Sequence, residues 1–176
     1  SNRFRSGTGL RFGGAPFDVP GRRVRWRTIA DTLGVVKGDD VREQQRNYVL
    51  KTVEERGVRL VRLWFTDVLG NLKSFAISPA ELDNALSDGM TFDGSSIDGF
   101  SRVQEADVLA VPDPDTFEIL PWGDSGATEA RVFCDIHHLD GTPFHGDPRQ
   151  VLRRHVQAAH AEGLTFYIAP DVEFFY

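Results

Sequence analysis

The sequence predicts an α+β fold, and three observations lead to that class. Short β-rich runs alternate with segments bounded by helix-start and helix-stop signals from residue 40 onward. Two neighbouring β-rich runs are separated by a short turn-forming stretch, as in a β-hairpin. Hydrophobic residues make up 40% of the 176-residue chain and aromatic residues 11%, which is enough apolar side chain to build a core.

Three helices are predicted from capping sequences. Each begins at an aspartate or serine able to accept a hydrogen bond from the first turn, two of the three have proline at the first helical position, and each is followed by glycine. The helices are predicted to start at Asp40–Glu43, Ser78–Glu81 and Asp147–Gln150 and to end by Gly57, Gly89 and Gly163.

The predicted strands are short and rich in β-branched and aromatic residues. Val58–Phe65 and Leu72–Ile77 flank the turn-forming stretch Asp67–Asn71 and form the predicted hairpin. Further strands are expected at Phe117–Leu120, Arg131–Ile136, Leu164–Ala169 and Val172–Tyr176. The last of these would leave the chain ending within an apolar strand, which is unusual for a complete domain.

Charge is unevenly distributed along the chain. Residues 1–30 contain seven arginines and one aspartate, whereas residues 31–176 contain 13 basic and 25 acidic residues. We interpret residues 1–37 as an Arg-rich, flexible N-terminal extension, because they are rich in glycine, proline and serine and lack periodicity. The acidic remainder argues against a nucleic-acid partner.

Composition also excludes other classes. No apolar run approaches the roughly 18 residues that a membrane-spanning helix needs, so we expect no membrane association. The single cysteine, Cys134, cannot form an intramolecular disulfide framework or a zinc site made only of cysteines. A lone thiol fits a reducing compartment, and we expect a cytoplasmic protein.

The first segment that could carry chemistry is Met90–Phe100. It contains two aspartates, two serines and two glycines in a stretch with neither helical nor strand periodicity. Glycine lets the backbone turn sharply, and aspartate and serine oxygens can accept hydrogen bonds from a cationic ligand. The same composition is typical of an Asx-turn whose side chains bind their own backbone, and composition alone favours that interpretation.

The second segment is Pro170–Phe175. In a strand, Asp171 and Glu173 would point to the same face and present two carboxylates side by side. Such an oxygen-only pair suits Mg²⁺ or Mn²⁺. The alternative is an exposed acidic strand face without a ligand.

Five short motifs occur in the order found in type I glutamine synthetases, and the resemblance extends from about Asp40 to Tyr176. The motifs are Arg62–Asp67, Phe92–Ile97, Pro112–Asp115, Cys134–Ile136 and Pro170–Phe175. The resemblance implies a β-grasp-like mixed sheet with packed helices over residues 38–140. Residues 141–176 would then be the beginning of a truncated catalytic domain, with its first helix and strand.

The resemblance also implies roles for individual residues. Asp93 would correspond to the family aspartate that binds ammonium and helps to remove its proton, with Ser96 beside it and Phe100 at a usually aromatic position nearby. Glu173 would correspond to a ligand of one of two divalent metal ions. The position that binds the other metal is usually glutamate, and here it is Asp171, whose side chain is shorter by one methylene group.

The function implied is ATP-dependent ligation of ammonia to glutamate through a γ-glutamyl phosphate. Two Mg²⁺ or Mn²⁺ ions would act per complete site, with ATP as co-substrate, in a ring of identical subunits that is commonly a dodecamer. The Asp93 loop would reach the active site of a neighbouring subunit. Since most of the catalytic domain is missing, the 176-residue chain alone is predicted to be inactive.

Two alternatives stay open at this point. The same scaffold could join glutamate to a larger amine and act as a γ-glutamyl-amide ligase, although Asp93 and Ser96 favour ammonia. The chain could also be a stand-alone, non-catalytic β-grasp protein that binds a partner.

Overall fold

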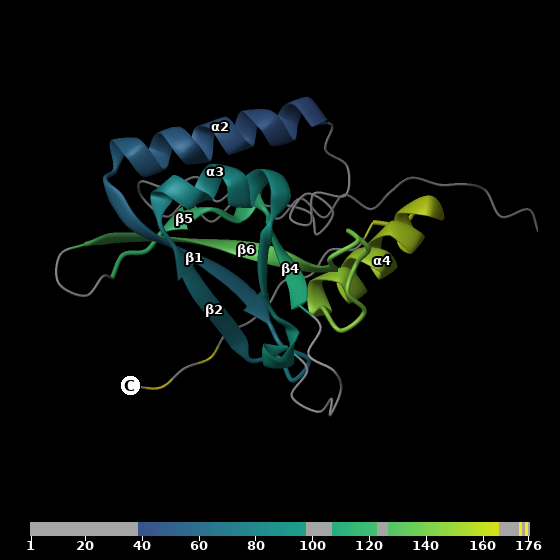
Figure 1. Ribbon diagram of the computed structural model, residues 1–176. Helices are drawn as coiled ribbons and strands as arrows, with labels where there is room; N and C mark the ends of the chain where they lie inside the picture. Colours follow the sequence, from purple (N-terminus) through teal and green to yellow (C-terminus); the bar gives the residue numbers. More distant parts are fainter. Residues whose placement is uncertain (1–38, 98–106, 123–126, 166–172, 174, 176) are drawn as a thin grey trace, which may run out of the picture.

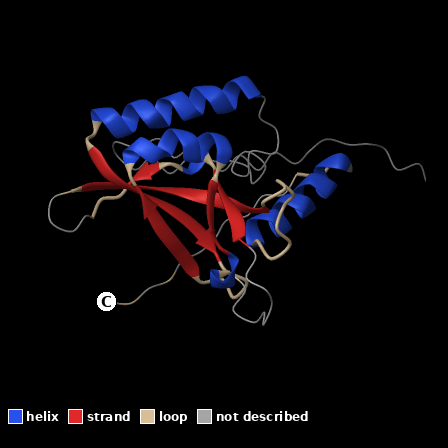
Figure 2. Cartoon of the chain, in the orientation of Figure 1, coloured by secondary structure: helices blue, strands red, loops and turns tan. Residues whose placement is uncertain are grey.

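The computed structural model describes residues 39–97, 107–122, 127–165, 173 and 175. A curled mixed sheet has helices α2 (Asp39–Glu55) and α3 (Pro79–Asp88) side by side on one face. A third helix, α4 (Pro148–Ala161), lies beside one end of the sheet (Figure 1). Figure 2 shows the same separation of helices and strands, and it confirms the predicted α+β class.

Six strands form the sheet in the order β2-β1-β6-β4-β3, and β5 also pairs with β6. Their bounds are Val58–Thr66 for β1, Leu72–Ile77 for β2, Met90–Asp93 for β3, Asp107–Pro112 for β4, Glu118–Ile119 for β5 and Thr128–His138 for β6. The predicted hairpin is confirmed, because β1 and β2 are antiparallel neighbours. Strand β6 runs parallel to β1 and antiparallel to β4 and β5.

The core lies between the sheet and the pair α2–α3. Alternate residues of β1 point into it, and Val61 and Leu63 are completely buried while the intervening Arg62 is not. On β6, Val132 and Cys134 are buried in the same way. Cys134 is a free thiol that acts as a small apolar core residue, and burial raises the pKa of that thiol well above its usual value.

The helix predictions hold apart from one boundary. The capping box at α3 is present, since the backbone N–H and the hydroxyl of Ser78 both donate to Glu81, over 3.0 and 2.9 Å. Gly89 ends α3 with a φ of 77°, a backbone conformation that favours glycine. A Cβ at this position would also lie only 2.8 Å from Leu109 Cγ, so both the conformation and the space require glycine. Helix α2 starts at Asp39, so the prediction that Asp40 is its N-cap is wrong. Asp40 instead occupies the first turn, where a carboxylate still meets the positive end of the helix dipole.

The predicted strands differ from the structure in several places. Met90–Asp93 forms β3 by pairing with β4, and its four residues alternate between half-buried and exposed. This alternation is too short to stand out within the longer segment Met90–Phe100. Strand β4 itself was not predicted. The run Phe117–Leu120 shortens to two strand residues, while Arg131–Ile136 extends to an 11-residue strand.

The predicted C-terminal strands are not observed in the part of the chain that the structure describes. Leu164, Thr165, Glu173 and Phe175 have no strand conformation, and residues 166–172, 174 and 176 lie outside the described residues. An apolar run becomes a strand only where a neighbouring backbone pairs with it. Across the described residues, no helix is long and apolar enough to cross a membrane.

Helix α4 is attached to the sheet through its first turn. The carboxylate of Asp147, which is buried, accepts hydrogen bonds from the backbone N–H of Arg149 and from that of Ile136 on β6, both over 2.9 Å. The guanidinium of Arg149 binds Asp113 at 2.7 Å and Asp135 at 2.9 Å. Asp135 also binds Arg153 at 2.7 Å. These interactions join α4, β6 and the segment after β4 into one unit.

Burial sets the protonation behaviour of this cluster. It raises the pKa of Asp113, and the nearby charge of Arg149 only partly offsets the effect. Burial alone would lower the pKa of Arg149, but Asp135 and Asp113 outweigh it, so that pKa is raised. Arg149 is therefore the cation that Asp113 binds, whereas Asp135 binds both Arg149 and Arg153.

Replacing Arg149 with methionine should destabilise the 176-residue chain by about 3 kcal/mol at pH 7, because it leaves Asp113 buried without its cation. Because the pKa of Asp113 is raised in the folded state, the folded chain keeps a proton on this carboxyl group to higher pH than the unfolded chain does. The contribution of this group to the free energy of unfolding is therefore lost as the pH rises through the raised pKa. Without Arg149 the pKa rises further, and the defect should be smaller at pH 5 than at pH 7.

Urea unfolding followed by circular dichroism at both pH values measures this difference. Arg154→Met, at an exposed position of the same helix, is the matched control and should change stability by less than about 0.5 kcal/mol. An Arg149→Met defect that does not change with pH would show that Asp113 does not depend on Arg149.

Candidate functional site

The Asp93 loop begins where β3 ends at the edge of the sheet. Asp93 closes the strand, and Gly94–Ser96 forms a single 3₁₀ turn, η1. A carboxylate oxygen of Asp93 accepts a hydrogen bond from the backbone N–H of Ser95 over 2.9 Å. The hydroxyl of Ser96 donates to the carbonyl oxygen of Asp93, also over 2.9 Å. The Asx-turn interpretation therefore describes the local geometry correctly.

This geometry leaves the two predicted side chains accessible. Asp93 and Ser96 are both exposed, whereas Ile97, directly after them, is completely buried. Hydrogen bonds from the backbone and then from the side chain of Ser95 lower the pKa of Asp93, with burial opposing them weakly. The loop thus presents an ionised carboxylate and a neighbouring hydroxyl to solvent, an arrangement that suits a small cation.

The structure describes three of the five predicted site residues, and of these it places Asp93 and Ser96 together in one loop. Phe100 and Asp171 lie outside the described residues. Glu173 is described and exposed, and its carboxylate has the oxygen chemistry that Mg²⁺ or Mn²⁺ prefers. Among the described residues, no group of three or more histidine, cysteine, aspartate or glutamate side chains could hold a metal ion. Glu173 alone is a candidate ligand rather than a coordination site.

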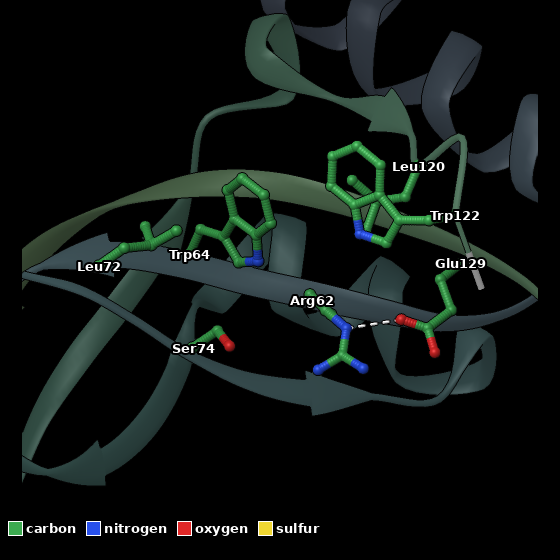
Figure 3. A pocket seen from close by; sticks show the side chains of 7 residues that line it. All are labelled: Arg62, Trp64, Leu72, Ser74, Leu120, Trp122 and Glu129. Atoms are coloured by element: carbon green, nitrogen blue, oxygen red, sulfur yellow. Dashed lines mark hydrogen bonds and ion pairs between the residues drawn. The ribbon is translucent and has the colours of Figure 1, made fainter. Parts of the chain in front are cut away.

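The sheet face opposite the helices carries a second polar and aromatic group that sequence reasoning missed. A depression of about 330 Å³ lies between β1, β2, β6 and the segment after β5 (Figure 3). Arg62 reaches across it and binds Glu129 at 2.6 Å, as the dashed line in Figure 3 marks. The residues lining the depression are Arg62, Trp64, Leu72, Ser74, Leu120, Trp122 and Glu129.

Aromatic contacts continue this face along β6. Trp64 meets Phe133 edge to face with ring centroids 5.6 Å apart, and the guanidinium of Arg131 lies over both rings. The strand alternation of Val58–Phe65 could have indicated this face, because it places Arg62 and Trp64 opposite the buried Val61 and Leu63. The neighbours on β6 could not be identified in that way, since the pairing of β1 with β6 is not visible in the sequence.

Comparison with known proteins bears on this fold and loop directly. Residues 57–139 match the family profile described as "Glutamine synthetase, beta-Grasp domain". The chain is 55% identical over 135 residues to a "Glutamine synthetase" of Mycobacterium tuberculosis (strain ATCC 25618 / H37Rv), which covers 76% of this chain and 30% of that protein. It is 47% identical over 127 residues to one of Thermotoga maritima, covering 72% of this chain and 29% of that protein.

A structural comparison finds a solved structure of similar fold. The chain resembles a solved structure described as "GmaS/ADP complex-Conformation 1" with a TM-score of 0.57 and 26% identity, over 65% of this chain and 26% of that one. The curled mixed sheet with its two helices is thus a glutamine synthetase β-grasp domain. The chain carries the N-terminal region of a glutamine synthetase, and it spans about 30% of the length of these curated relatives.

The pKa of Asp93 should lie below that of an unperturbed aspartate, which is about 3.9. A carbon-13 NMR titration of the carboxyl group in the 176-residue chain measures it. In Ser95→Ala the backbone donor remains, so the pKa should rise only partway toward the ordinary value. A midpoint at or above the ordinary value would show that the Ser95 N–H does not bind the carboxylate in solution.

Proposed function

We propose that the full-length protein is an ATP-dependent glutamate–ammonia ligase and that this chain supplies the ammonium-side loop of its active site. The observation that carries the proposal is the 55% identity over 135 residues to named glutamine synthetases, together with an exposed, ionised Asp93 in the matched loop. In the reaction, the γ-phosphoryl group of ATP moves to the γ-carboxylate of glutamate and ADP leaves. Ammonia then attacks the carbonyl carbon of the γ-glutamyl phosphate, inorganic phosphate departs from that carbon, and glutamine is formed.

Asp93 would attract ammonium to the loop and hold it beside Ser96. Its lowered pKa makes it a good partner for a cation and a weak proton acceptor, so we assign it mainly to ammonium binding. The ammonium ion must lose a proton before its nitrogen has a lone pair with which to attack. That proton would pass to the water that reaches the exposed Asp93. Phe100, seven residues after Asp93, would border the same pocket.

Metal binding and location complete the proposal. Glu173 and Asp171 would each bind one of two Mg²⁺ or Mn²⁺ ions, which neutralise the phosphate charges of ATP when bound. The remaining ligands and the contacts to ATP and glutamate would come from the rest of the full-length protein.

The free, buried Cys134 supports a reducing, cytoplasmic location.

We also propose that the loop acts on a neighbouring subunit in a homo-oligomeric ring. Asp93 and Ser96 are exposed on the chain that carries them, which leaves them available to an adjoining surface. A loop acting between subunits would make each complete site a joint product of two protomers.

The full-length protein should release phosphate from ATP when both glutamate and ammonium are present. Asp93→Asn, which removes the negative charge at nearly constant volume, should lower kcat/KM for ammonium by about 10²-fold or more while leaving ATP binding intact. Asp88→Asn, at the exposed last residue of α3 just before β3, should behave like the unmodified protein. The 176-residue chain by itself should release no phosphate.

The same assay tests the alternative amine donors. Faster turnover with methylamine, ethanolamine or a polyamine than with ammonium would overturn the ammonia assignment in favour of a γ-glutamyl-amide ligase. Equal kcat/KM for ammonium in Asp93→Asn and the unmodified protein would remove Asp93 from the site.

Mixed rings test whether the loop acts between subunits. Asp93→Asn and Glu173→Gln subunits are each expected to be inactive, but a ring assembled from equal amounts should recover about a quarter of full activity, because that share of sites combines two intact contributions. Complementation is measured after mixing, dissociation and reassembly. Mixed rings as inactive as either parent would mean that Asp93 and Glu173 act from the same subunit.

A further inference from the structure

Asp67 directly follows β1 and closes the motif Arg62–Asp67, and the proposed chemistry gives it no role. Its side chain is buried at the turn between β1 and β2. One carboxylate oxygen, Oδ1, accepts hydrogen bonds from the backbone N–H of Leu69 over 3.0 Å and of Asn71 over 2.8 Å. The other, Oδ2, accepts one from the amide group of Asn71 over 3.0 Å.

These bonds define the shape of the turn. The backbone N–H of Asp67 also donates to the carbonyl oxygen of Asn71, and the backbone N–H of Gly70 donates to the carbonyl oxygen of Asp67, both over 3.0 Å. Lys73 lies 3.8 Å from Oδ2 with 45% of its side chain exposed, and an ion pair of that kind contributes little. Hydrogen bonds to the carboxylate, rather than its charge pairing with Lys73, therefore hold the turn.

The turn between β1 and β2 contacts the Asp93 loop. The backbone N–H of Val68 donates to the carbonyl oxygen of Ile97 over 3.4 Å. Ile97 is completely buried, and its own N–H donates to Gly94 over 3.0 Å, which closes η1. Figure 2 shows this short helical turn next to the end of the hairpin.

The hairpin also holds the other end of the loop. Phe92, directly before Asp93, packs against Phe65 of β1 with ring centroids 4.8 Å apart and against Phe75 of β2 at 5.5 Å. Strands β2 and β3 are at opposite ends of the strand order, so the curl of the sheet creates this contact. The four residues from Asp93 to Ser96 are thereby held between two points of attachment to one hairpin.

We propose that Asp67 is a positioning residue for Asp93, which acts by shaping the hairpin turn that fixes the carbonyl of Ile97. The inference rests on the proposed function of Asp93. Asp67 is assigned no contact with substrate. Losing the turn would release the C-terminal end of a four-residue loop whose other end stays packed at Phe92. A displacement of about 1 Å at a reacting group can cost on the order of 10²-fold in rate.

Four variants of the full-length protein separate the contributions. Asp67→Ala removes every side-chain bond of the turn, and it should raise KM for ammonium by about 10-fold or more while KM for ATP and for glutamate changes less than about two-fold. Asp67→Asn keeps an acceptor at the Oδ1 position and should retain most of the affinity for ammonium. Lys73→Met removes only the ion pair and should match the unmodified protein. Asn71→Ala removes only the hydrogen bond to Oδ2 of Asp67 and should raise KM for ammonium by about three-fold. This variant replaces Asp67→Ala in the test if Asp67→Ala fails to assemble.

The outcomes distinguish this inference from the proposed function. If the unmodified protein uses ammonium and Asp93→Asn impairs it, but Asp67→Ala leaves KM for ammonium unchanged, positioning by Asp67 is wrong and the proposed function stands. If Asp67→Ala and Asn71→Ala raise all three KM values equally, or lower only thermal stability, the residue is merely structural and the inference fails. A selective rise in KM for ammonium, rescued in Asp67→Asn, supports it.

Discussion

Backbone pairing by β6 is the constraint on which the rest of the molecule depends. This single strand pairs with β1 in parallel along its first half and with β4 in antiparallel fashion along its second half. The short strand β5 also pairs with its first half, in antiparallel fashion. Without β6, no backbone pairing would connect the β1–β2 hairpin to β4 and β3. Its side chains serve both faces, with Val132 and Cys134 in the core and Arg131 and Phe133 on the open face.

The sheet curls, and the curl supports the loop that carries Asp93. It brings Phe92 of β3 back against Phe65 and Phe75 of the hairpin, although these strands are far apart in the strand order. The loop after β3 is consequently supported from two sides while its polar side chains stay exposed. A rigid support under an accessible carboxylate is what a binding loop requires.

Helix α4 shows a different means of attachment. It is joined to the sheet mainly by charged and polar groups, since Arg149 bridges Asp113 and Asp135 and Asp147 accepts from the backbone of β6. Buried ion pairs contribute less to stability than apolar packing of the same volume, but their directionality fixes one orientation. Helix α4 is therefore oriented on the sheet by a few polar contacts, in which Arg149 is joined by Asp147, Gln150 and Arg153.

The sequence by itself determined the features that depend on near neighbours. The capping box at Ser78, the hairpin around Asp67–Asn71, the Asx-turn at Asp93 and the family motifs all involve residues within a few positions of one another. Tertiary structure alone decided the features that join distant segments. The pairing of β3 with β4, the bridge from Arg149 to Asp113, and the contact between Val68 and Ile97 join partners 14 to 36 residues apart, and no local preference encodes such pairs. Local conformation follows from steric and hydrogen-bonding preferences of adjacent residues, whereas these contacts exist only once chain folding has brought the partners together.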